Sequence, residues 1–127
     1  MHLKAQMSAE FFVFVGLAVL IAIAFEIISL GQLNDFRLQK ENEAVRDLAL
    51  KLQQELLVAS TVEDGYVRTF QIPDSIEIIN YSLSTQNSTI TVKSKNSLYI
   101  ASLPKVVGNV SKGANTINKT GGVIYIN

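Results

Sequence analysis

The sequence contains no cysteine, which excludes disulfides, thiolate catalysis and cysteine-ligated metal sites. Its one histidine is His2, and the rest of the sequence holds no phosphate-binding glycine loop and no metal-ligand spacing. Asp74 and Glu77 are the only acidic residues after Gly65, and their position beside Pro73 is typical of turn chemistry. The composition predicts a protein that is not an enzyme and that uses no cofactor or metal.

Neither sign of charge is in excess, because 11 basic residues balance 11 acidic ones. This balance removes any overall attraction to nucleic acid. The local distribution is uneven: residues 34–64 carry four basic and seven acidic side chains, whereas residues 65–127 carry six basic and two acidic ones. The two regions can attract each other, within or between subunits, but two ordinary solvated surfaces are the simpler explanation, because exposed ion pairs contribute little.

One long apolar run stands out near the N-terminus. Residues 11–33 read FFVFVGLAVLIAIAFEIISLGQL, in which Glu26 is the single charge. At about 1.5 Å per residue, a helix of this length spans roughly 34 Å, enough to cross a bilayer core of about 30 Å. An ordinary secretory signal peptide has a shorter core and a small-residue cleavage site after it, whereas this run continues into a charged helix. We therefore expect a transmembrane helix.

Residues 34–60 contain no proline or glycine and are rich in good helix formers. The apolar residues of this stretch recur at spacings of three, four and seven, which places them on one helical face: Leu38, Val45, Leu48, Leu52, Leu56 and Ala59. Leu50 and Leu57 mark a second strip. Gly31 is a candidate kink, and without a kink the helix is continuous for about 50 residues.

The residues after the turn signal Asp64-Gly65 change to Val, Ile, Tyr and Thr with stretches of alternating polarity. We expect strands at residues 66–72, 76–84, 88–94, 98–103 and 123–126, with a short one near 106–110. Short connections favour antiparallel pairing. The sequence therefore predicts an α+β fold: a long N-terminal helix, transmembrane and then amphipathic, followed by a small antiparallel sheet or sandwich, called here the head.

The seven residues before the apolar run carry a motif. They read Lys4-Ala5-Gln6-Met7-Ser8-Ala9-Glu10. This resembles the class III signal peptide of archaeal type IV pilin-like proteins, in which a basic residue and a small residue precede the cleaved bond and the mature chain opens as Gln-x-Ser-x-Glu. Phe14 stands where the family pattern usually has Leu. The resemblance covers about 30 residues and does not extend to the head.

The resemblance implies a division of the chain and a processing step. A prepilin-peptidase-like enzyme would recognise Lys4, Ser8 and Glu10 and cut between Ala5 and Gln6. The expected parts are a leader at residues 1–5, a transmembrane and filament-core helix at 6–33, an amphipathic stalk helix at 34–60 and a β-rich surface head at 65–127. Because the cut precedes the apolar run, the mature subunit stays in the membrane until it is assembled.

Two carboxylates in or beside the apolar run need partners. The resemblance implies that Glu10 meets the free amine of Gln6 in a neighbouring subunit and so fixes the register of the incoming helix. The alternative is that Glu10 caps the first helical turn. Glu26 lies 16 residues further on, about 24 Å along a helix, where it reaches the outer interface of the membrane or makes a polar contact inside a filament.

The head contains four Asn-x-Ser/Thr sequons, at Asn80, Asn87, Asn109 and Asn118. Such sequons are acceptors for N-glycosylation on exposed surfaces. Each is weak evidence alone, but the resemblance implies a surface-displayed subunit and hence a candidate glycoprotein. Asn87 and Asn118 lie in the most turn-like contexts.

The function expected from these observations is structural. The resemblance implies a subunit of an archaeal pilus-like filament, packed with copies of itself or related pilins and displaying its head for adhesion. An assembly ATPase and a membrane platform protein are partners implied by the same resemblance, and nucleic acid is not expected. The alternative is a membrane-anchored binding module at the cell surface or a minor pilin.

Overall fold

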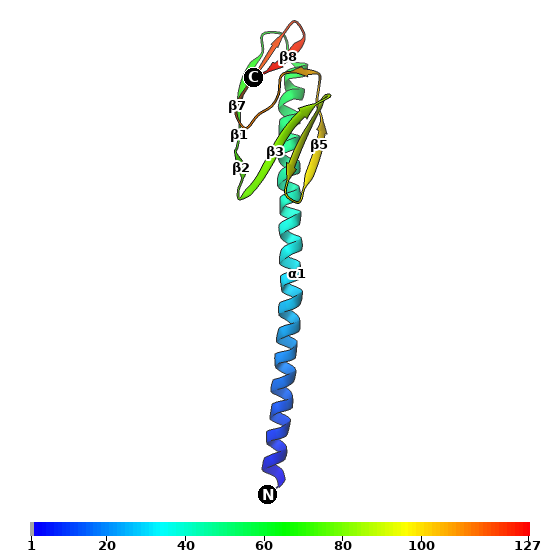
Figure 1. The fold of residues 1–127 in the computed structure, drawn as a ribbon, viewed down its shortest axis with the longest axis vertical. Coiled ribbons are helices and arrows are strands. Elements are labelled where there is room, and N and C mark those ends of the chain that lie inside the picture. The colour runs from blue at the N-terminus through cyan, green and yellow to red at the C-terminus, as the bar shows by residue number, and fades with distance from the viewer. Residues whose placement is uncertain (1) are drawn as a thin grey trace. The chain divides into compact units, whose positions relative to one another are not determined.

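The computed structural model describes residues 2–127, with side chains from Ala9 onward. Helix α1 (His2–Thr61) is followed by eight short strands, β1 to β8, which confirms the α+β fold (Figure 1). The chain divides into two compact units, Met1–Arg37 and Leu38–Asn127. Residues 38–61 of α1 therefore belong to the same unit as the strands. The helix begins at His2, within the expected leader, and its assignment continues without a break through Gly31.

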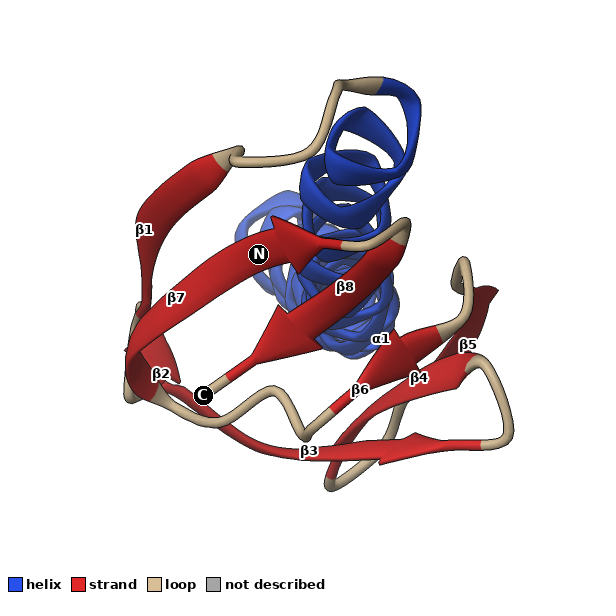
Figure 2. Ribbon diagram, turned by 90° about the horizontal axis from the view of Figure 1, so that it is seen from above, coloured by secondary structure: helices blue, strands red, loops and turns tan. Residues whose placement is uncertain are grey.

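The strands of the second unit form two four-stranded sheets, in the orders β1-β7-β8-β6 and β2-β3-β4-β5. Their bounds are β1 (Val67–Ile72), β2 (Ser75–Ile76), β3 (Ile79–Gln86), β4 (Thr89–Ser94), β5 (Leu98–Ser102), β6 (Val106–Val107), β7 (Gly113–Thr120) and β8 (Val123–Ile126). Neighbouring strands pair antiparallel, as expected, except that β6 pairs parallel with β8. In Figures 1 and 2 the sheets curve around the part of α1 that belongs to this unit.

One face of α1 fills the space that the two sheets enclose. Val45, Leu48, Leu52, Leu56 and Ala59 are buried, as the spacing of apolar residues predicts. They pack in one cluster with side chains from both sheets, including Ile72, Ile90, Ile117 and Ile126. Leu38 belongs to the same sequence pattern but is 44% exposed. The buried helical face therefore begins at Val45.

The sequence analysis missed strand β7, because residues 113–120 contain Gly, Asn, Lys and Thr with one isoleucine. The inward positions of β7 are Asn115, Ile117 and Lys119, of which Asn115 is fully buried. The Asn115 side chain is satisfied locally, since Nδ2 donates to the carbonyls of Ser111 and Gly113 and Oδ1 accepts from the Ser111 amide. Because the buried position 115 is polar, β7 lacks the alternation of apolar and polar residues that predicts a strand.

The expected strand at residues 76–84 is also wrong in one respect. The chain turns back at Glu77-Ile78, so that β2 and β3 form a hairpin in which Ile76 pairs with Ile79. Glu77 adopts a positive φ of 54°. Left-handed residues are usually Gly, Asn or Asp, so a Glu-Ile turn carries no sequence signal. The Glu77 carboxylate forms an exposed ion pair with Lys40, whose Nζ lies 2.9 Å away.

Polar contacts tie α1 to the sheets at both ends of the second unit. Near its start, Glu41 accepts hydrogen bonds from the side chains of Ser94 and Asn96, which lower the pKa of its carboxyl group. Near its end, Lys119 Nζ donates to the carbonyls of Ser60 and Val62, at 2.8 and 2.6 Å. Ser60 belongs to the last turn of α1 and Val62 directly follows the helix, at an end where helical partners for carbonyls are missing and a cation is favourable.

The uneven charge distribution produces one close contact inside the second unit. Arg68 on β1 forms a two-point ion pair with Glu55 on α1, with nitrogen to oxygen distances of 2.7 and 2.9 Å. The Glu55 side chain is only 17% exposed. The acidic helix and the basic head therefore attract each other here within one chain.

Gly108 follows β6 at a point where the chain passes closely over β8. Its φ is +109°, and a Cβ at this position would lie 1.9 Å from the carbonyl oxygen of Ile126. We expect Gly108→Ala to destabilise the second unit by about 3 kcal/mol or more, because both the backbone conformation and the contact are unfavourable. Thermal unfolding of the detergent-solubilised chain measures the loss.

The matched control is Gly113→Ala. Gly113 has a similar φ of +92°, but a Cβ there would meet nothing within 4 Å. This substitution should cost only the conformational strain, about 1 kcal/mol. Equal losses for the two variants would show that the close approach of Gly108 to β8 is unimportant.

Candidate functional site

The candidate functional site of the first unit is the surface of α1 itself. A helical segment with mean hydropathy 2.8 over its most apolar window is long and apolar enough to cross a membrane, and none of that window is buried. Its large aromatic side chains are among the most exposed, with Phe12, Phe14 and Phe25 each about 70% accessible. The long apolar helix is thus compatible with a single-pass membrane anchor.

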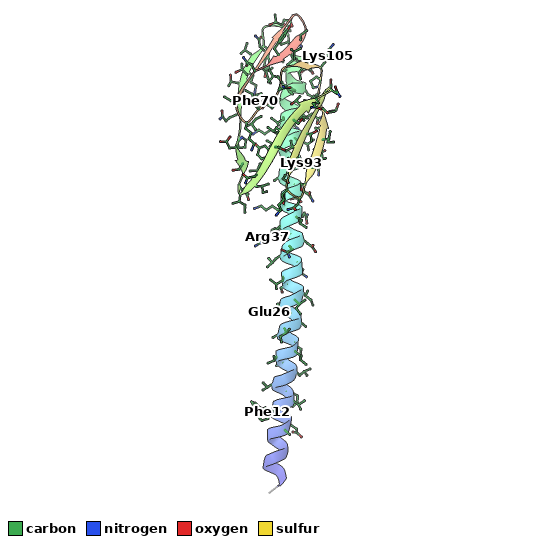
Figure 3. The ribbon with its side chains drawn as sticks, in the orientation of Figure 1. Phe12, Glu26, Arg37, Phe70, Lys93 and Lys105 are labelled. Carbon is green, nitrogen blue, oxygen red and sulfur yellow. The ribbon has the colours of Figure 1, made fainter. Side chains whose placement is uncertain are left out.

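Charges are sparse along this surface. Glu10 and Glu26 are both exposed, and Figure 3 shows Glu26 projecting from the side of α1 between Phe12 and Arg37. Sixteen residues separate the two carboxylates in sequence, which corresponds to about 24 Å along the axis and roughly 160° around it. Glu10 and Glu26 therefore point to nearly opposite sides of the helix, and the same neighbouring helix does not meet both.

The predicted processing motif lies at the start of α1. The side chains of Lys4, Ala5, Gln6 and Ser8 fall outside the described ones, so their contacts with a processing enzyme stay predictions. Glu10 is the first residue of the motif with both a predicted role and a described side chain. Its pairing with the amine of Gln6 from another subunit also stays a prediction.

All four sequon asparagines are exposed. Asn80 lies on β3, Asn87 in the β3–β4 turn with a φ of 49°, Asn109 between β6 and β7, and Asn118 on β7. Placement on a strand corrects the expectation that Asn118 lies in a turn. Its side chain shares the outer face of the sheet with three apolar residues.

Together with Asn118, these residues form a row that the sequence did not predict and that crosses the sheet β1-β7-β8-β6 from edge to edge. Val67 pairs with Asn118, Asn118 with Tyr125, and Tyr125 with Val107. These four residues, called here the outer row, border an open hollow of about 330 Å³. The Gly121-Gly122 pair between β7 and β8 is a hairpin signal that would have revealed the missing strand. The row itself depends on the register of all four strands.

The described residues were also compared with the requirements of a metal site. Among the side chains that the structure describes, those of residues 9–127, no three His, Cys, Asp or Glu gather in a way that could hold a metal ion. Comparisons with protein-family models, with curated proteins and with solved structures found no match. The function is therefore inferred from the residues of this chain.

Proposed function

We propose that this protein is a structural subunit of an archaeal type IV pilus-like cell-surface filament, anchored and assembled through α1. The observation that carries the proposal is the motif from Lys4 to Glu10, placed directly before an apolar run whose large side chains are exposed. A processing site on this side of the helix keeps the helix in the mature protein. The helix then serves first as an anchor and later as a packing surface.

The energetics favour two successive environments for this helix. Fifteen large apolar side chains between residues 11 and 33 are exposed. At about 1.5–2 kcal/mol each, covering them is worth on the order of 20–30 kcal/mol before the entropy cost of association is subtracted. A bilayer supplies this cover before assembly, and the helices of neighbouring subunits supply it in a filament. The assembly ATPase and platform protein that move the subunit between them are partners implied by the resemblance.

The core and the surface charge of the head also support a role at the filament surface. The second unit has a continuous core of its own and holds six basic residues among its strands and loops. It needs no cover from the first unit to bury that core, so it can stand at the filament surface. In a filament of copies of this chain, the heads would face outward and supply the contact surface for adhesion.

The first experiment concerns the processing site. The mature N-terminus in the source cells should be Gln6, and Lys4→Gln should leave the chain uncleaved because it removes the basic residue before the cut. N-terminal sequencing or mass spectrometry of the membrane and filament fractions measures both. His2→Gln is the control, since it lies in the leader outside the motif.

Two outcomes would count against the proposal in different ways. A mature chain that begins beyond Leu33 would identify an ordinary secreted protein without an anchor. A chain that begins at Gln6 but occurs only in the membrane fraction, never in sheared surface filaments, would favour the membrane-anchored binding module instead.

A further inference from the structure

Two strands of the second unit leave long edges open. The strands at the ends of the two sheets are β1 and β6 in one sheet and β2 and β5 in the other. β2 and β6 have two residues each, whereas β1 has six and β5 has five. Within the part of the chain that the structure describes, β1 pairs only with β7 and β5 only with β4. Each long edge strand therefore presents main-chain N–H and C=O groups that no other strand bonds.

The open groups of β1 belong to Val67, Thr69 and Gln71. The main-chain N–H of Lys119 donates to the carbonyl of Tyr66 at 2.9 Å. Because hydrogen-bonded pairs alternate along an antiparallel ladder, β7 bonds the even-numbered residues of β1. The odd-numbered residues therefore direct their N–H and C=O groups away from the sheet, and their side chains are exposed.

The open groups of β5 belong to its even-numbered residues. Just beyond the strand, the N–H of Leu103 donates to the carbonyl of Ser88 at 2.7 Å, so β4 bonds the odd-numbered residues. The carbonyl of Ser102 agrees with this direction, because it accepts a hydrogen bond from the side chain of Gln53 on α1 at 2.6 Å. Helix α1 thus occupies one end of the β5 edge and leaves the rest open.

Neither edge has the usual protection against another strand. Proteins protect exposed edges with charged side chains, prolines and bulges. Strand β5 contains no charge, proline or glycine, and Leu98 and Ile100 are each 56% exposed. The one charge of β1, Arg68, is bound to Glu55 on α1. Both edges can therefore accept a further strand.

The two edge strands run in opposite directions beside α1. β5 runs parallel to the helix, because the chain contacts Asn42 just before β5 and Gln53 at its end. β1 runs the other way, from Glu55 toward Lys40, which the chain contacts just after β2. Figures 1 and 2 show β1 and β5 on opposite sides of the part of α1 that belongs to this unit. Two copies side by side with parallel helices therefore bring β1 of one copy beside β5 of the other, in antiparallel directions.

We propose that β1 of one copy pairs antiparallel with β5 of the next copy, so that the sheets of neighbouring heads join edge to edge. The inference rests on the proposed function, because a filament holds the helices of successive copies parallel. In the register that joins the open groups, Thr69 lies opposite Ile100 of the neighbour, and Gln71 lies opposite Leu98. Each copy has one edge of each kind, so the contact is head-to-tail and adds copies without closing a dimer.

The same register matches the side chains between these pairs. Phe70 lies opposite Tyr99 of the neighbour, at a position without hydrogen bonds, where side chains are closest. Both aromatic side chains are partly buried at the margin of the core in the single chain. The pairing covers their open sides with each other, and cross-strand aromatic pairs stabilise antiparallel sheets.

The charges around the two edges favour β1 with β5 over β5 with itself. Glu63 and Asp64 precede β1, and in the antiparallel arrangement they approach Lys105, which follows β5 of the neighbour. Antiparallel pairing of two β5 strands would instead place Lys95 of one copy near Lys105 of the other. Like charges opposite each other destabilise a strand pair.

The pairing is weak between free heads and strong between aligned ones. It consists of a few main-chain hydrogen bonds, each of which replaces a bond to water. Packed helices hold neighbouring heads side by side and so raise their effective concentration. The heads therefore join in the filament, whereas an isolated second unit stays monomeric.

Cysteine pairs test the contact, since the chain has no cysteine of its own. A full-length chain with both Thr69→Cys and Ile100→Cys should give disulfide-linked dimers, trimers and longer oligomers after mild oxidation of sheared filaments. Residues opposite each other in an antiparallel pair have Cα atoms about 5.5 Å apart, within disulfide range. Neither single variant should form linked oligomers. Non-reducing electrophoresis measures the products.

The matched control combines Thr69→Cys with Ser84→Cys. Ser84 lies in the same cross-strand row as Ile100, since both pair with Thr91 or its neighbour strand, but it belongs to β3, two strands away from the β5 edge. This control should give no linked oligomers, because its cysteine does not reach β1 of the next copy.

A charge at the edge gives a second measurement. Ile100→Lys should lower incorporation into filaments about fivefold, because it places a charge in the joined sheet. Ser84→Lys should lower it less than twofold. Both variants should keep the melting temperature of the detergent-solubilised chain, since both side chains lie on the outer face.

Several results would overturn the pairing while the proposed function stands. They are filaments that give no linked oligomers, equal products from the Ser84 control, and dimers from Ile100→Cys alone, which would show that β5 pairs with itself. An unsubstituted chain that is absent from filaments would instead remove the proposed function, and with it the aligned helices that the pairing requires.

Discussion

A fragment that begins at Gly65 should show no cooperative thermal unfolding, whereas a fragment that begins at Asn34 should be soluble and monomeric and should unfold in one transition. Six of the 16 buried apolar residues of the second unit lie on α1. Removing Val45, Leu48, Leu52 and Leu56 alone forfeits about 6–12 kcal/mol at 1.5–3 kcal/mol per side chain. That loss equals or exceeds the whole stability of most domains.

Adjacent leucines on α1 provide the matched control in the Asn34 fragment. Leu56 is fully buried between the sheets, whereas Leu57 is 46% exposed on the other side of the helix. Leu56→Ala should destabilise the fragment by about 2–5 kcal/mol, and Leu57→Ala by less than about 1 kcal/mol. Urea unfolding followed by circular dichroism measures both. A Gly65 fragment as stable as the longer one, or equal losses for the two leucines, would mean that the head closes its own core.

The parts of the fold that follow from local composition were predictable. Hydropathy predicts the helix over residues 11–33 and good helix formers predict it over residues 34–60. The period of the apolar residues identifies the face from Val45 to Ala59 that the core uses. Strand β7 escaped because its inward positions include Asn115 and Lys119. Asn115 forms hydrogen bonds within its own loop, and Lys119 donates to a carbonyl at the end of α1. Tertiary hydrogen bonds decide which polar residues are buried, and the periodicity of apolar residues does not predict them.

The apolar anchor and the outer row also differ in how far they can be predicted from the sequence. An apolar anchor is a property of consecutive residues, so hydropathy alone identifies it. The outer row joins Val67, Val107, Asn118 and Tyr125, which come from four strands and are up to 58 positions apart in sequence. Only the register of the sheet, including the parallel β6–β8 pair, brings them together. Each sequon could be read from the sequence, but the neighbours of Asn118 across the sheet could not.

Glu10→Gln should leave membrane insertion intact while lowering incorporation into filaments at least tenfold. The substitution keeps the shape of the side chain and removes its charge, so the proposed contact with the Gln6 amine of a neighbour loses its electrostatic part. In an apolar filament core, leaving that amine without its partner costs about 3–5 kcal/mol, and 1.4 kcal/mol already corresponds to a factor of ten. Quantitative immunoblotting of sheared filaments against the membrane fraction measures the ratio.

Glu26→Gln is the control that separates a register contact from a general need for charge on α1. Glu26 lies about 24 Å from Glu10 and on nearly the opposite side of the helix, and at the outer interface its charge is hydrated before assembly. Its substitution should therefore change incorporation less than threefold. Capping of the first helical turn by Glu10 predicts a different pattern, because the interaction of a carboxylate with a helix N-terminus is worth only about 0.3–1 kcal/mol. Near-normal filament yield from Glu10→Gln, with reduced helicity at the start of α1, would support capping and remove the salt bridge from the assembly mechanism.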